Sequence, residues 1–372
     1  MRAIILAAGQ GSRMNQLTSS LPKCLLQFGE NTILTKLRKQ LHEVGIKEIH
    51  IVVGYLKEKI YDEVKKFPIP NEKIVFIENN EYKIDTNIHS LSLALSEDET
   101  PFYLFEGDIV FDDQAIYEIV SNKWLNKSIW FTKGKFEAGM YGGILSSDNE
   151  NKISDIKIVK DYSDHLSKYE KLIGVMKVGK NEVMKFKEML LQKSKESFKS
   201  YYLNAWFENL NELPCFSASL KNFKTFSFNT EHEYKDALEK YYINMPYELV
   251  KVSDLYCIEK FDEDRVIWLK EKIFSDGVWT QPLKIEQKHH LILDGHHRFE
   301  VAKILGLKYL PCELYDYDDV PTWSLRPEIK ISKEEVIKQS LNGDTYPYKT
   351  VKHQFYSLSK CSIELGELKE DL

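Results

Sequence analysis

The chain opens with an apolar run that leads directly into two glycines, and this string constrains the fold more than any other. The run is MRAIILAA, residues 1–8, and Gly9 and Gly11 follow it. A short apolar run that ends in glycines is typical of a buried parallel strand. Because glycine has no Cβ, backbone N–H groups at such a strand end can approach an anion closely. The string therefore predicts a parallel sheet with an anion-binding loop at one strand end.

Strand and helix signals alternate through the first hundred residues. The apolar residues of 31–45 fall on one helical face, and Gly45 is a suitable C-cap. Three apolar runs read as further strands: 46–54, 73–79 and 101–111. Strand–helix–strand units of this spacing predict a mostly parallel sheet with right-handed crossovers. Since 114–230 adds strands of mixed direction, we expect an α/β domain with a Rossmann-like but mixed sheet.

The length of the chain predicts a second domain. At roughly 100–200 residues per domain, 372 residues suit two domains. Thr230 and Glu233 have the spacing of a capping box, so 229–243 is expected to be the closing helix of the first domain. We therefore predict a first domain over 1–243 and a smaller α+β domain over 244–372.

Composition excludes several classes of protein. Acidic residues outnumber basic ones, 57 against 51, which argues against a nucleic-acid-coating protein. The sequence has no run of about 18 apolar residues, and its first residues lack the pattern of a signal peptide. Five scattered cysteines without a C-x-x-C pair indicate reduced thiols. We expect a cytoplasmic protein without a membrane span.

Charged and hydroxyl side chains surround the two glycines. Ser12 offers a hydroxyl donor, Arg13 can bind phosphate oxygens bidentately, and Lys23 adds a mobile point charge. Together they suit a triphosphate. The string is neither G-x-G-x-x-G nor a Walker A loop, so dinucleotide and P-loop sites are excluded. For two bare glycines, the alternative is a tight strand-exit turn that binds no ligand.

The complete string LAAGQGSRM, residues 6–14, followed by Pro22-Lys23, resembles the nucleotidyltransferases that make NDP-sugars and CDP-alcohols. DTNIHSLSLA (85–94) and YLFEGDIVF (103–111) are similar to the phosphocholine-type cytidylyltransferases. The resemblance implies a CTP site in which Arg13 and Lys23 are catalytic. It also implies a set of binding residues for nucleotide and acceptor: Leu6, Ala7, Ala8, Gly9, Gly11, Ser12, Thr86, Asn87 and Ser90.

The same resemblance implies Mg²⁺ as the cofactor, with Asp108 as a ligand. Asp108 stands where a parallel strand should end, which is where open α/β sheets bind ligands. The family's second metal carboxylate lies in an [IV]-D-T string, whereas this chain has FNT, with Asn229. An amide oxygen carries less charge than a carboxylate. Either Asn229 is a weaker metal ligand or another carboxylate takes its place.

The chemistry implied for this domain needs no nucleophilic side chain. An acceptor phosphate attacks the α-phosphorus of CTP, and pyrophosphate leaves. The protein aligns the groups and neutralises charge through Mg²⁺, Lys23, Arg13 and loop amides. Aromatic and carboxylate residues that would hold a choline ammonium cannot be identified from the sequence.

A second motif lies in LILDGHHRFEVAKILGLKYLPCELYDYD, residues 291–318. Asp294-Gly295 is a turn after an apolar strand, and His296, His297 and Arg298 open a helix. A helix N-terminus beside an arginine is an anion site. Adjacent histidines on a helix point to different sides, so they are not expected to share one metal ion.

The string D-G-x-H-R resembles the ParB/sulfiredoxin-like fold, and D-G-H-H-R with its flanks is closest to the free serine kinases over 246–356. The resemblance implies Glu259 as the base toward the serine hydroxyl, with Glu263 as the alternative, and Asp294 and His296 as further catalytic residues. It also implies substrate-binding residues. Phosphate, amino-acid and nucleotide contacts are assigned to Gly295, His297, Arg298, Trp323, Arg326, Lys349, Thr350 and His353.

The two halves predict consecutive reactions. A serine kinase uses ADP or ATP to make O-phospho-L-serine, and a cytidylyltransferase needs a phosphomonoester acceptor. We therefore predict a bifunctional enzyme that forms phosphoserine and then CDP-L-serine from CTP. Two alternatives stay open: phosphocholine, phosphoethanolamine or a phosphonate as acceptor, or a ParB-like regulatory or DNA-binding module. The acidic balance and the lack of a following helix-turn-helix segment argue against DNA.

Overall fold

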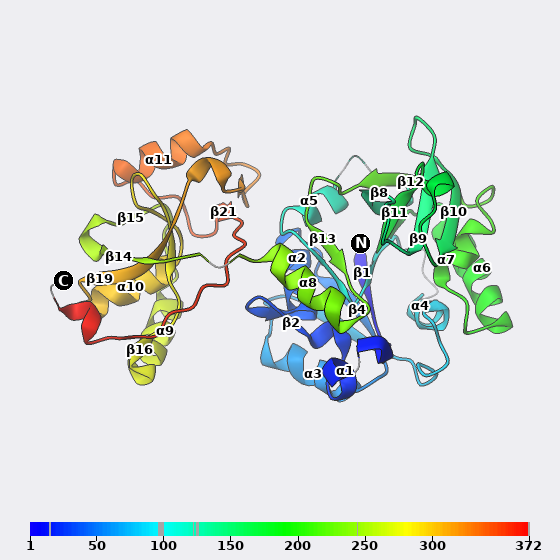
Figure 1. Cartoon of the computed structure of the whole chain (residues 1–372), viewed down its shortest axis with the longest axis horizontal. Coiled ribbons are helices and arrows are strands. Elements are labelled where there is room, and N and C mark those ends of the chain that lie inside the picture. The colour runs from blue at the N-terminus through cyan, green and yellow to red at the C-terminus, as the bar shows by residue number, and fades with distance from the viewer. Residues whose placement is uncertain (15, 96–99, 122, 124–125, 244, 371–372) are drawn as a thin grey trace. The chain divides into compact units, whose positions relative to one another are not determined.

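The computed structural model describes all residues except 15, 96–99, 122, 124–125, 244 and 371–372. The chain divides into two compact units, Met1–Tyr241 and Tyr242–Leu372 (Figure 1). Each unit has its own sheet and its own hydrophobic core. The sequence-based boundary falls after residue 243, and the assignment of one activity to each part stays a proposal.

The first unit is built on a mixed sheet with the order β10-β9-β11-β6-β1-β4-β5, which β8 and β12 extend from β11. Strands β6, β1, β4 and β5 are parallel, and β11 runs antiparallel to β6. The strands are β1 (Arg2–Ala7), β4 (Glu48–Val53), β5 (Lys73–Glu78), β6 (Phe102–Glu106), β8 (Ile129–Lys135), β9 (Gly142–Ser147), β10 (Ile153–Val159), β11 (Glu170–Val178) and β12 (Phe216–Ser219).

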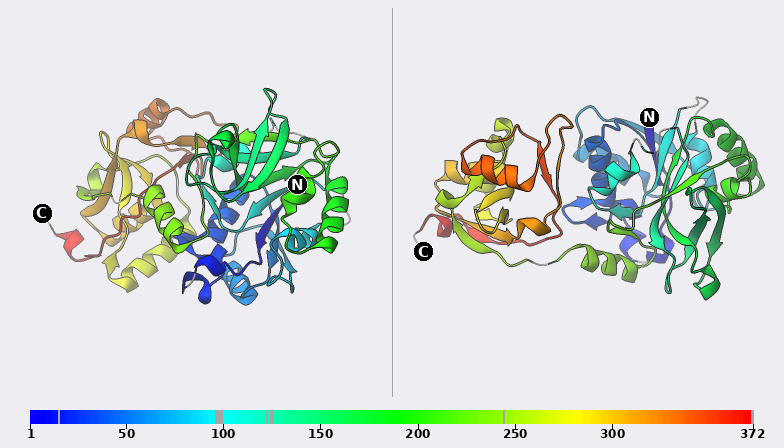
Figure 2. Two further views of the ribbon diagram at one scale, coloured as in Figure 1. Left: turned by 45° about the vertical axis from the view of Figure 1, so that its right-hand side comes forward. Right: turned by 90° about the horizontal axis from the view of Figure 1, so that it is seen from above.

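Helices cover both faces of this sheet because the strands are apolar on both sides (Figures 1 and 2). Along β1, Ala3 and Ile5 pack with Leu37, whereas Ile4 packs with Leu91 on the opposite face. One layer contains α2 (Ile33–Glu43), α3 (Lys57–Lys66) and α5 (Ala115–Ile119). The other contains α4 (Ile88–Ala94), α6 (Val183–Glu196) and α7 (Tyr202–Phe207).

Further elements complete the first unit. They are α1 (Gln16–Ser19), β2 (Gln27–Phe28), β3 (Asn31–Thr32), β7 (Ile109–Phe111), β13 (Thr225–Ser227) and α8 (Glu231–Tyr241). Ser227 pairs with Ile109 across the antiparallel β13–β7 pair, so the chain leaving β13 passes beside Asp108. The predicted capping box of α8 is present, since Glu233 N donates to Thr230 Oγ1 at 3.2 Å and Thr230 N to the Glu233 carboxylate at 3.1 Å.

The second unit has a smaller mixed sheet with the order β14-β19-β17-β18-β15. Its strands are β14 (Glu248–Lys251), β15 (Tyr256–Cys257), β17 (Leu283–Glu286), β18 (Leu291–Asp294) and β19 (Tyr309–Tyr315). One core lies under α9 (Glu263–Asp276) and α10 (His296–Leu305), and another under α11 (Lys333–Leu341). The remaining strands pair as β16 (Val278–Trp279) with β22 (Ile363–Glu364) and β20 (Thr322–Ser324) with β21 (Val351–His353).

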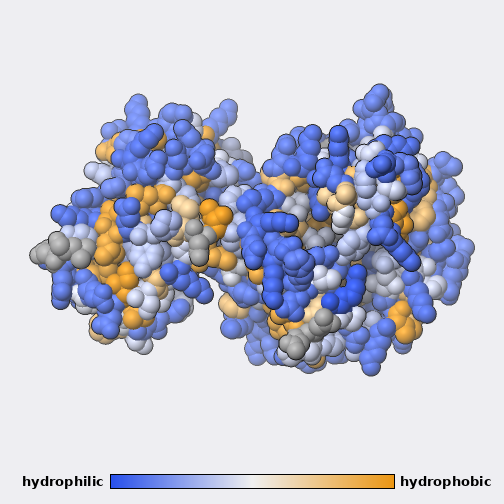
Figure 3. Space-filling model, in the orientation of Figure 1, coloured by the Kyte–Doolittle hydropathy of each residue, from blue (hydrophilic) through white to orange (hydrophobic). Residues whose placement is uncertain are grey.

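The predicted fold class is confirmed, with an α/β nucleotidyltransferase-type sheet in the first unit and a smaller mixed sheet with helices in the second. Hydrophilic side chains cover most of the face shown in Figure 3 in both units. Within the described residues, no helix is both long and apolar enough to cross a membrane.

Candidate active sites

A cavity of about 280 Å³ in the first unit gathers segments that are distant in sequence. It is lined by the end of β1 and the following loop, the β6–β7 turn, the start of α4 and the segments before α7 and α8. The predicted residues that line it are Leu6, Ala7, Ala8, Gly9, Gly11, Arg13, Lys23, Thr86, Asn87, Ser90, Asp108 and Asn229. Ser12 does not line this cavity.

The glycines around the cavity differ in whether the backbone requires glycine at that position. Gly11 has φ +62°, the left-handed region that other residues rarely adopt. A Cβ on Gly107 would lie 2.6 Å from the carbonyl oxygen of Leu6, so the β6–β7 turn packs directly on β1. Gly9 has neither constraint, because its φ is not positive and no described atom lies within 4 Å of where its Cβ would be. The fold does not require glycine at position 9, and the space it leaves lies in the cavity wall.

Positive side chains and oxygen ligands meet at one point of the cavity. Lys23 Nζ donates to Asp108 Oδ2 in a part-buried ion pair, and Asn229 Oδ1 lies 3.5 Å from the same ammonium. Arg13 Nη2 donates to Asn229 Oδ1 at 2.8 Å. Two predicted phosphate-binding cations therefore contact the two predicted metal ligands.

Asp108 and Asn229 supply only two of the oxygen ligands that a magnesium ion needs, so a nucleotide and water must supply the others. Among the described residues, no cluster of three or more His, Cys, Asp or Glu side chains forms a metal site by itself. Asp108 and Asn229 nevertheless both direct an oxygen at one cation, the Lys23 ammonium. Mg²⁺ normally takes one or two protein oxygens and completes its shell with phosphate and water. The pair thus fits a nucleotide-bound Mg²⁺.

The carboxylate nearest to Asn229 is Glu233, which is already engaged. Glu233 Oε2 accepts the backbone N–H of Asn229 at 2.6 Å, and Glu233 Oε1 accepts the hydroxyl of Tyr141 at 2.9 Å. Tyr141 in turn accepts Asn229 Nδ2 at 3.0 Å. Because Glu233 caps α8 and fixes the Asn229 amide, it supports the predicted ligand from behind and does not line the cavity.

The TNIHS segment at the start of α4 is held by its own hydrogen bonds. Asp85, which the sequence did not single out, accepts the backbone N–H of His89 at 3.0 Å and of Ser90 at 2.8 Å. The Ser90 hydroxyl donates to Asp85 at 2.6 Å, and Asn87 Oδ1 accepts the backbone N–H of Tyr202 at 2.9 Å. These bonds position the segment at the cavity. Thr86 contributes by donating from Oγ1 to the carbonyl of Lys199 at 3.0 Å.

Glu106 is a cavity residue that sequence reasoning missed. It ends β6, and its Oε1 accepts the hydroxyl of buried Tyr202 at 3.0 Å. Burial and the neighbouring Asp108 raise the pKa of Glu106 to about 7. Burial lowers the pKa of Lys171, on β11, to about 8. Glu106 stands in the quoted string FEGD, so the acidic residue two positions before Asp108 was the available signal.

In the second unit, Glu259 lies against the stretch 349–353, which holds the predicted substrate-binding residues Lys349, Thr350 and His353. Its Oε1 accepts the backbone N–H of Thr350 at 2.7 Å and that of Val351. Burial raises the pKa of Glu259, and the backbone hydrogen bonds oppose this shift. Glu263, the alternative base, begins α9 and is exposed. Of the two, Glu259 is the buried carboxyl, and it contacts the predicted site residue Thr350.

The two histidines of D-G-H-H-R act as hydrogen-bond acceptors at the start of α10. His296 Nε2 accepts the backbone N–H of Ile258 at 3.3 Å, and His297 Nε2 accepts that of Asp262 at 3.1 Å. Burial lowers the pKa of His296 to about 4 and also lowers the pKa of His297. Both rings are therefore neutral at neutral pH, with Nδ1–H as the remaining donor.

The Arg298 guanidinium is already engaged by three groups of the protein. It pairs with Asp294 at 2.8 Å and donates to the carbonyls of Gln281 at 3.1 Å and Pro282 at 2.8 Å. Gly295 has φ +108°, and a Cβ there would collide with Leu283 and make a tight contact of 3.2 Å with Arg298 Nη2. The tight turn thus fixes the guanidinium against the end of β18.

The remaining predicted residues of the second unit lie on or next to the paired strands β20 and β21. Trp323 and Arg326 lie on and after β20, which pairs with β21, and Arg326 Nη2 donates to the carbonyl of Tyr348 at 3.0 Å. Lys349 has φ +56° and Thr350 is fully buried. The His353 ring contacts the Tyr317 hydroxyl at 2.9 Å, and burial lowers its pKa to about 3.

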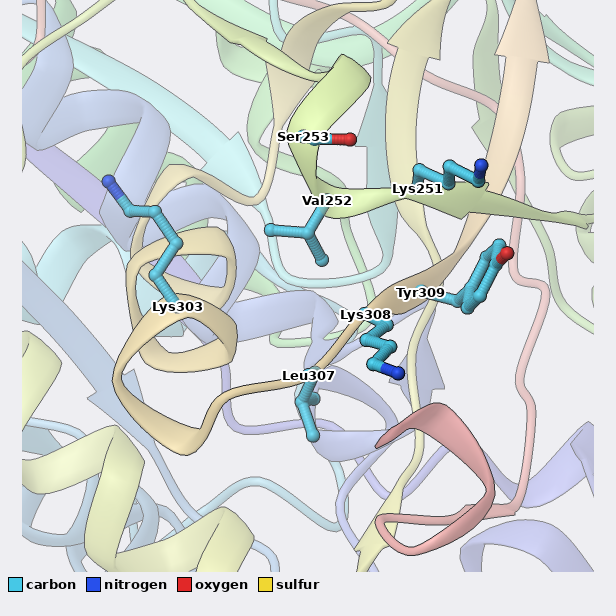
Figure 4. Close-up of a pocket in the computed structure, with 7 residues that line it drawn as sticks. All are labelled: Lys251, Val252, Ser253, Lys303, Leu307, Lys308 and Tyr309. Carbon is cyan, nitrogen blue, oxygen red and sulfur yellow. The ribbon is translucent and has the colours of Figure 1, made fainter. Parts of the chain in front are cut away.

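A second cavity, of about 510 Å³, lies elsewhere in the second unit and contains none of the predicted site residues (Figure 4). It is lined by Lys251, Val252, Ser253, Lys303, Leu307, Lys308 and Tyr309. Lys303 is paired with Glu300 at 2.6 Å, and the ammonium groups of Lys251, Lys303 and Lys308 point in different directions. They do not converge on one point as the cations of the first cavity do.

The fold and the charged cavity of the first unit define a nucleotidyltransferase class, and comparison with known proteins agrees. Residues 3–145 match the MobA-like NTP transferase domain. The chain is 31% identical over 163 residues to a 2-aminoethylphosphonate cytidylyltransferase of Lancefieldella rimae, covering 44% of this chain and 62% of that protein. Residues 3–145, within the first unit, thus form a MobA-like nucleotidyltransferase domain.

Two solved structures align with different parts of the chain. CTP:phosphocholine cytidylyltransferase from Streptococcus pneumoniae aligns with a TM-score of 0.53 and 24% identity, over 63% of this chain and 96% of its own, which shows a shared fold. A free serine kinase in complex with AMP aligns over 34% of this chain and 95% of its own, with a TM-score of 0.31 and 17% identity. The chain spans less than two thirds of the curated cytidylyltransferase it matches.

Proposed function

We propose that the protein is a bifunctional enzyme that phosphorylates L-serine in its second unit and transfers CMP from CTP to the resulting O-phospho-L-serine in its first unit. The observation that carries the proposal is the Lys23–Asp108–Asn229–Arg13 cluster beside the glycine loop. It places two cations and two metal-type oxygens in one cavity. Cytidylyl transfer needs this arrangement and no side-chain nucleophile.

In the proposed cytidylyl transfer, a phosphate oxygen of phosphoserine attacks the α-phosphorus of CTP. The bond from that phosphorus to the β-phosphate oxygen breaks, and pyrophosphate leaves, so the products are CDP-L-serine and pyrophosphate. Arg13 and Lys23 stabilise the charge that develops on the phosphate oxygens. Asp108 and Asn229 would hold Mg²⁺, which supplies further charge neutralisation when bound.

In the proposed kinase step, Glu259 takes the proton of the serine hydroxyl while the serine oxygen bonds to the terminal phosphorus of ADP or ATP. The nucleotide leaves with one phosphate fewer. The backbone N–H groups of Thr350 and Val351 bind Glu259 Oε1, that of Lys349 also hydrogen-bonds the carboxyl, and we assign Oε2 to the serine hydroxyl. The neutral histidines of α10 donate from Nδ1 to the phosphates, and Asp294 orients Arg298 beside them.

The main rival keeps the cytidylyl transfer and changes the acceptor. It is supported by the similarity of the first unit to a protein named for 2-aminoethylphosphonate. Phosphocholine and phosphoethanolamine belong to the same group of candidate acceptors. Each would be a substrate of the first unit without any contribution from the second unit.

The test is pyrophosphate release by the full chain with CTP and Mg²⁺ and one acceptor at a time. We expect the highest kcat/KM with O-phospho-L-serine. A higher kcat/KM with phosphocholine or 2-aminoethylphosphonate would overturn the proposed acceptor. Lack of pyrophosphate with every acceptor would overturn the proposed cytidylyl transfer itself.

A further inference from the structure

Glu106 is a carboxylate in the first cavity that the proposed cytidylyl transfer does not use. It lines the cavity at the end of β6, two positions before Asp108. Tyr202, from α7, donates its hydroxyl to Oε1 at 3.0 Å. The second oxygen, Oε2, has no hydrogen-bond partner among the described residues and lies against Gly174 of β11, where a Cβ would collide with it. Backbone and side-chain packing thus fix the carboxylate in one position.

The nearby cations do not neutralise Glu106 by direct contact. Lys23 pairs with Asp108. Lys171 donates to the carbonyls of Gly143 at 3.2 Å and Leu172 at 2.9 Å, so both lysines affect Glu106 only through space. A partly buried carboxylate is normally paired with a cation or fully hydrogen-bonded. The cavity is therefore built to receive a positive group at Glu106.

A ligand ammonium fits this position better than a second metal ligand does. Glu106 is hydrogen-bonded to Tyr202 on α7, whereas Asp108 is paired with Lys23 beside Asn229. The two carboxylates thus have separate partners in the cavity. An ammonium donates in several directions and needs one oriented carboxylate, whereas Mg²⁺ needs several oxygens in a nearly octahedral arrangement.

We propose that Glu106, oriented by Tyr202, binds an ammonium group of the acceptor and so selects phosphate or phosphonate acceptors that carry an amine. The inference rests on the proposed cytidylyl transfer and names the substrate class of the same cavity. Glu106 is the specificity-determining residue, and Tyr202 is a positioning residue. Phosphoserine belongs to this class, as does every other amine-bearing phosphomonoester.

The experiment compares three acceptors with the full chain, CTP and Mg²⁺. O-phosphoserine carries an ammonium and a carboxylate, phosphoethanolamine an ammonium alone, and 3-phosphoglycerate a hydroxyl in place of the ammonium. Glu106→Gln should lower kcat/KM for the two ammonium acceptors roughly 10- to 100-fold and change that for 3-phosphoglycerate less than about 3-fold. Tyr202→Phe should give the same acceptor pattern with a smaller loss.

Glu170→Gln is the matched control, since Glu170 lies on β11 and binds Thr132 at 2.7 Å outside the cavity. Its acceptor profile should equal that of the wild type. The inference is overturned if Glu106→Gln lowers kcat/KM equally for all three acceptors. It is also overturned if the variant needs a higher Mg²⁺ concentration with all three.

The two proposals fail in different ways. Wild-type turnover of phosphoethanolamine but not phosphoserine overturns CDP-L-serine formation, and the Glu106→Gln pattern still decides the ammonium site. Wild-type preference for 3-phosphoglycerate overturns the ammonium site. If Glu106→Gln does not fold, Tyr202→Phe and Glu106→Asp provide the same comparison, with Glu106→Asp expected to keep the preference for amines at reduced kcat/KM.

Discussion

Arg13 donates from Nη2 to Asn229 Oδ1 at 2.8 Å and so joins the loop after β1 to the segment before α8, 216 positions later. Asn229 is the place where the chain departs from the carboxylate implied by the cytidylyltransferase resemblance. The contact shows that the amide oxygen faces Arg13 and Lys23, the two predicted phosphate-binding cations, and the metal role of Asn229 stays a prediction.

We predict that Asn229→Asp lowers the Mg²⁺ concentration for half-maximal pyrophosphate release several-fold, because a carboxylate binds Mg²⁺ more strongly than an amide. Asn229→Ala should raise that concentration. A Mg²⁺ titration of pyrophosphate release measures both changes. Asn71→Asp, in a turn outside the cavity, is the control and should leave the titration unchanged. An unchanged midpoint in Asn229→Asp would contradict a metal role for position 229.

Lys23 and Lys36 form a matched pair for testing electrostatic catalysis. The side chains of Lys23 and Asp108 are 12% and 24% exposed, and those of Lys36 and Asp113 are 13% and 24% exposed. Lys23→Met should lower kcat for pyrophosphate release by about 10²–10³-fold, because it removes a preorganised charge at the reacting phosphates. Lys36→Met should leave kcat unchanged. Equal losses in the two variants would mean that Lys23 only supports the fold.

Substitutions at Gly9 and Gly11 distinguish an effect on ligand binding from an effect on backbone conformation. Gly11→Ala should destabilise the first unit by about 1–2 kcal/mol, because φ at this position is +62°. Gly9→Ala should leave the free energy of unfolding unchanged and raise KM for CTP about 10-fold, because its methyl group would enter the cavity in which CTP is proposed to bind. Urea unfolding and CTP saturation curves measure the two effects. An unchanged KM for CTP in Gly9→Ala would support a turn that binds no ligand.

The second unit should lose stability in mild acid. Burial lowers the pKa of His296 to about 4 from an ordinary value near 6.5, so the unfolded chain binds more protons than the folded chain between these values. Stability present above pH 6.5 should therefore fall as pH decreases toward 4, by on the order of 2–3 kcal/mol for this residue. Protonation also removes the acceptor for Ile258 N–H.

This loss is measured by urea unfolding at pH 4, 5, 6 and 7, with hydrogen exchange of α10 peptides as the probe of the second unit. His296→Gln should flatten the dependence on pH. The matched control, His232→Gln, changes an exposed histidine on α8 and should leave the dependence intact. A slope that is unchanged in His296→Gln would show that other groups cause the acid sensitivity.

Local spacing explains how much of the first site could be predicted. The glycine loop, Arg13 and Lys23 lie within a single short stretch, and Asp108 is marked by its place at the end of a strand. Glu106 was missed because the residues that surround it are distant in sequence. Tyr202 is 96 positions later, and Gly174 lies on the neighbouring strand β11. A strand-end glutamate by itself is typical of a solvated edge.

In the second unit, too, contacts between residues distant in sequence could not be predicted. The sequence predicted that His296 and His297 open a helix after a turn, and α10 begins at His296. It did not reveal that both rings accept backbone N–H groups of Ile258 and Asp262, since those partners depend on how the segment before α9 folds back. Asp85 was missed for a related reason, because its capping contacts to His89 and Ser90 require α4 to be in place.

The most direct test of the two-step account is phosphorus NMR of the full chain with L-serine, CTP, Mg²⁺ and either ADP or ATP. We predict that a phosphoserine monoester resonance appears first and is replaced by a coupled pair of diphosphate resonances as pyrophosphate accumulates. Glu259→Gln should show neither product from serine and should recover the coupled pair when phosphoserine is supplied. Failure of the wild-type chain to convert supplied phosphoserine and CTP into the coupled pair would contradict the account.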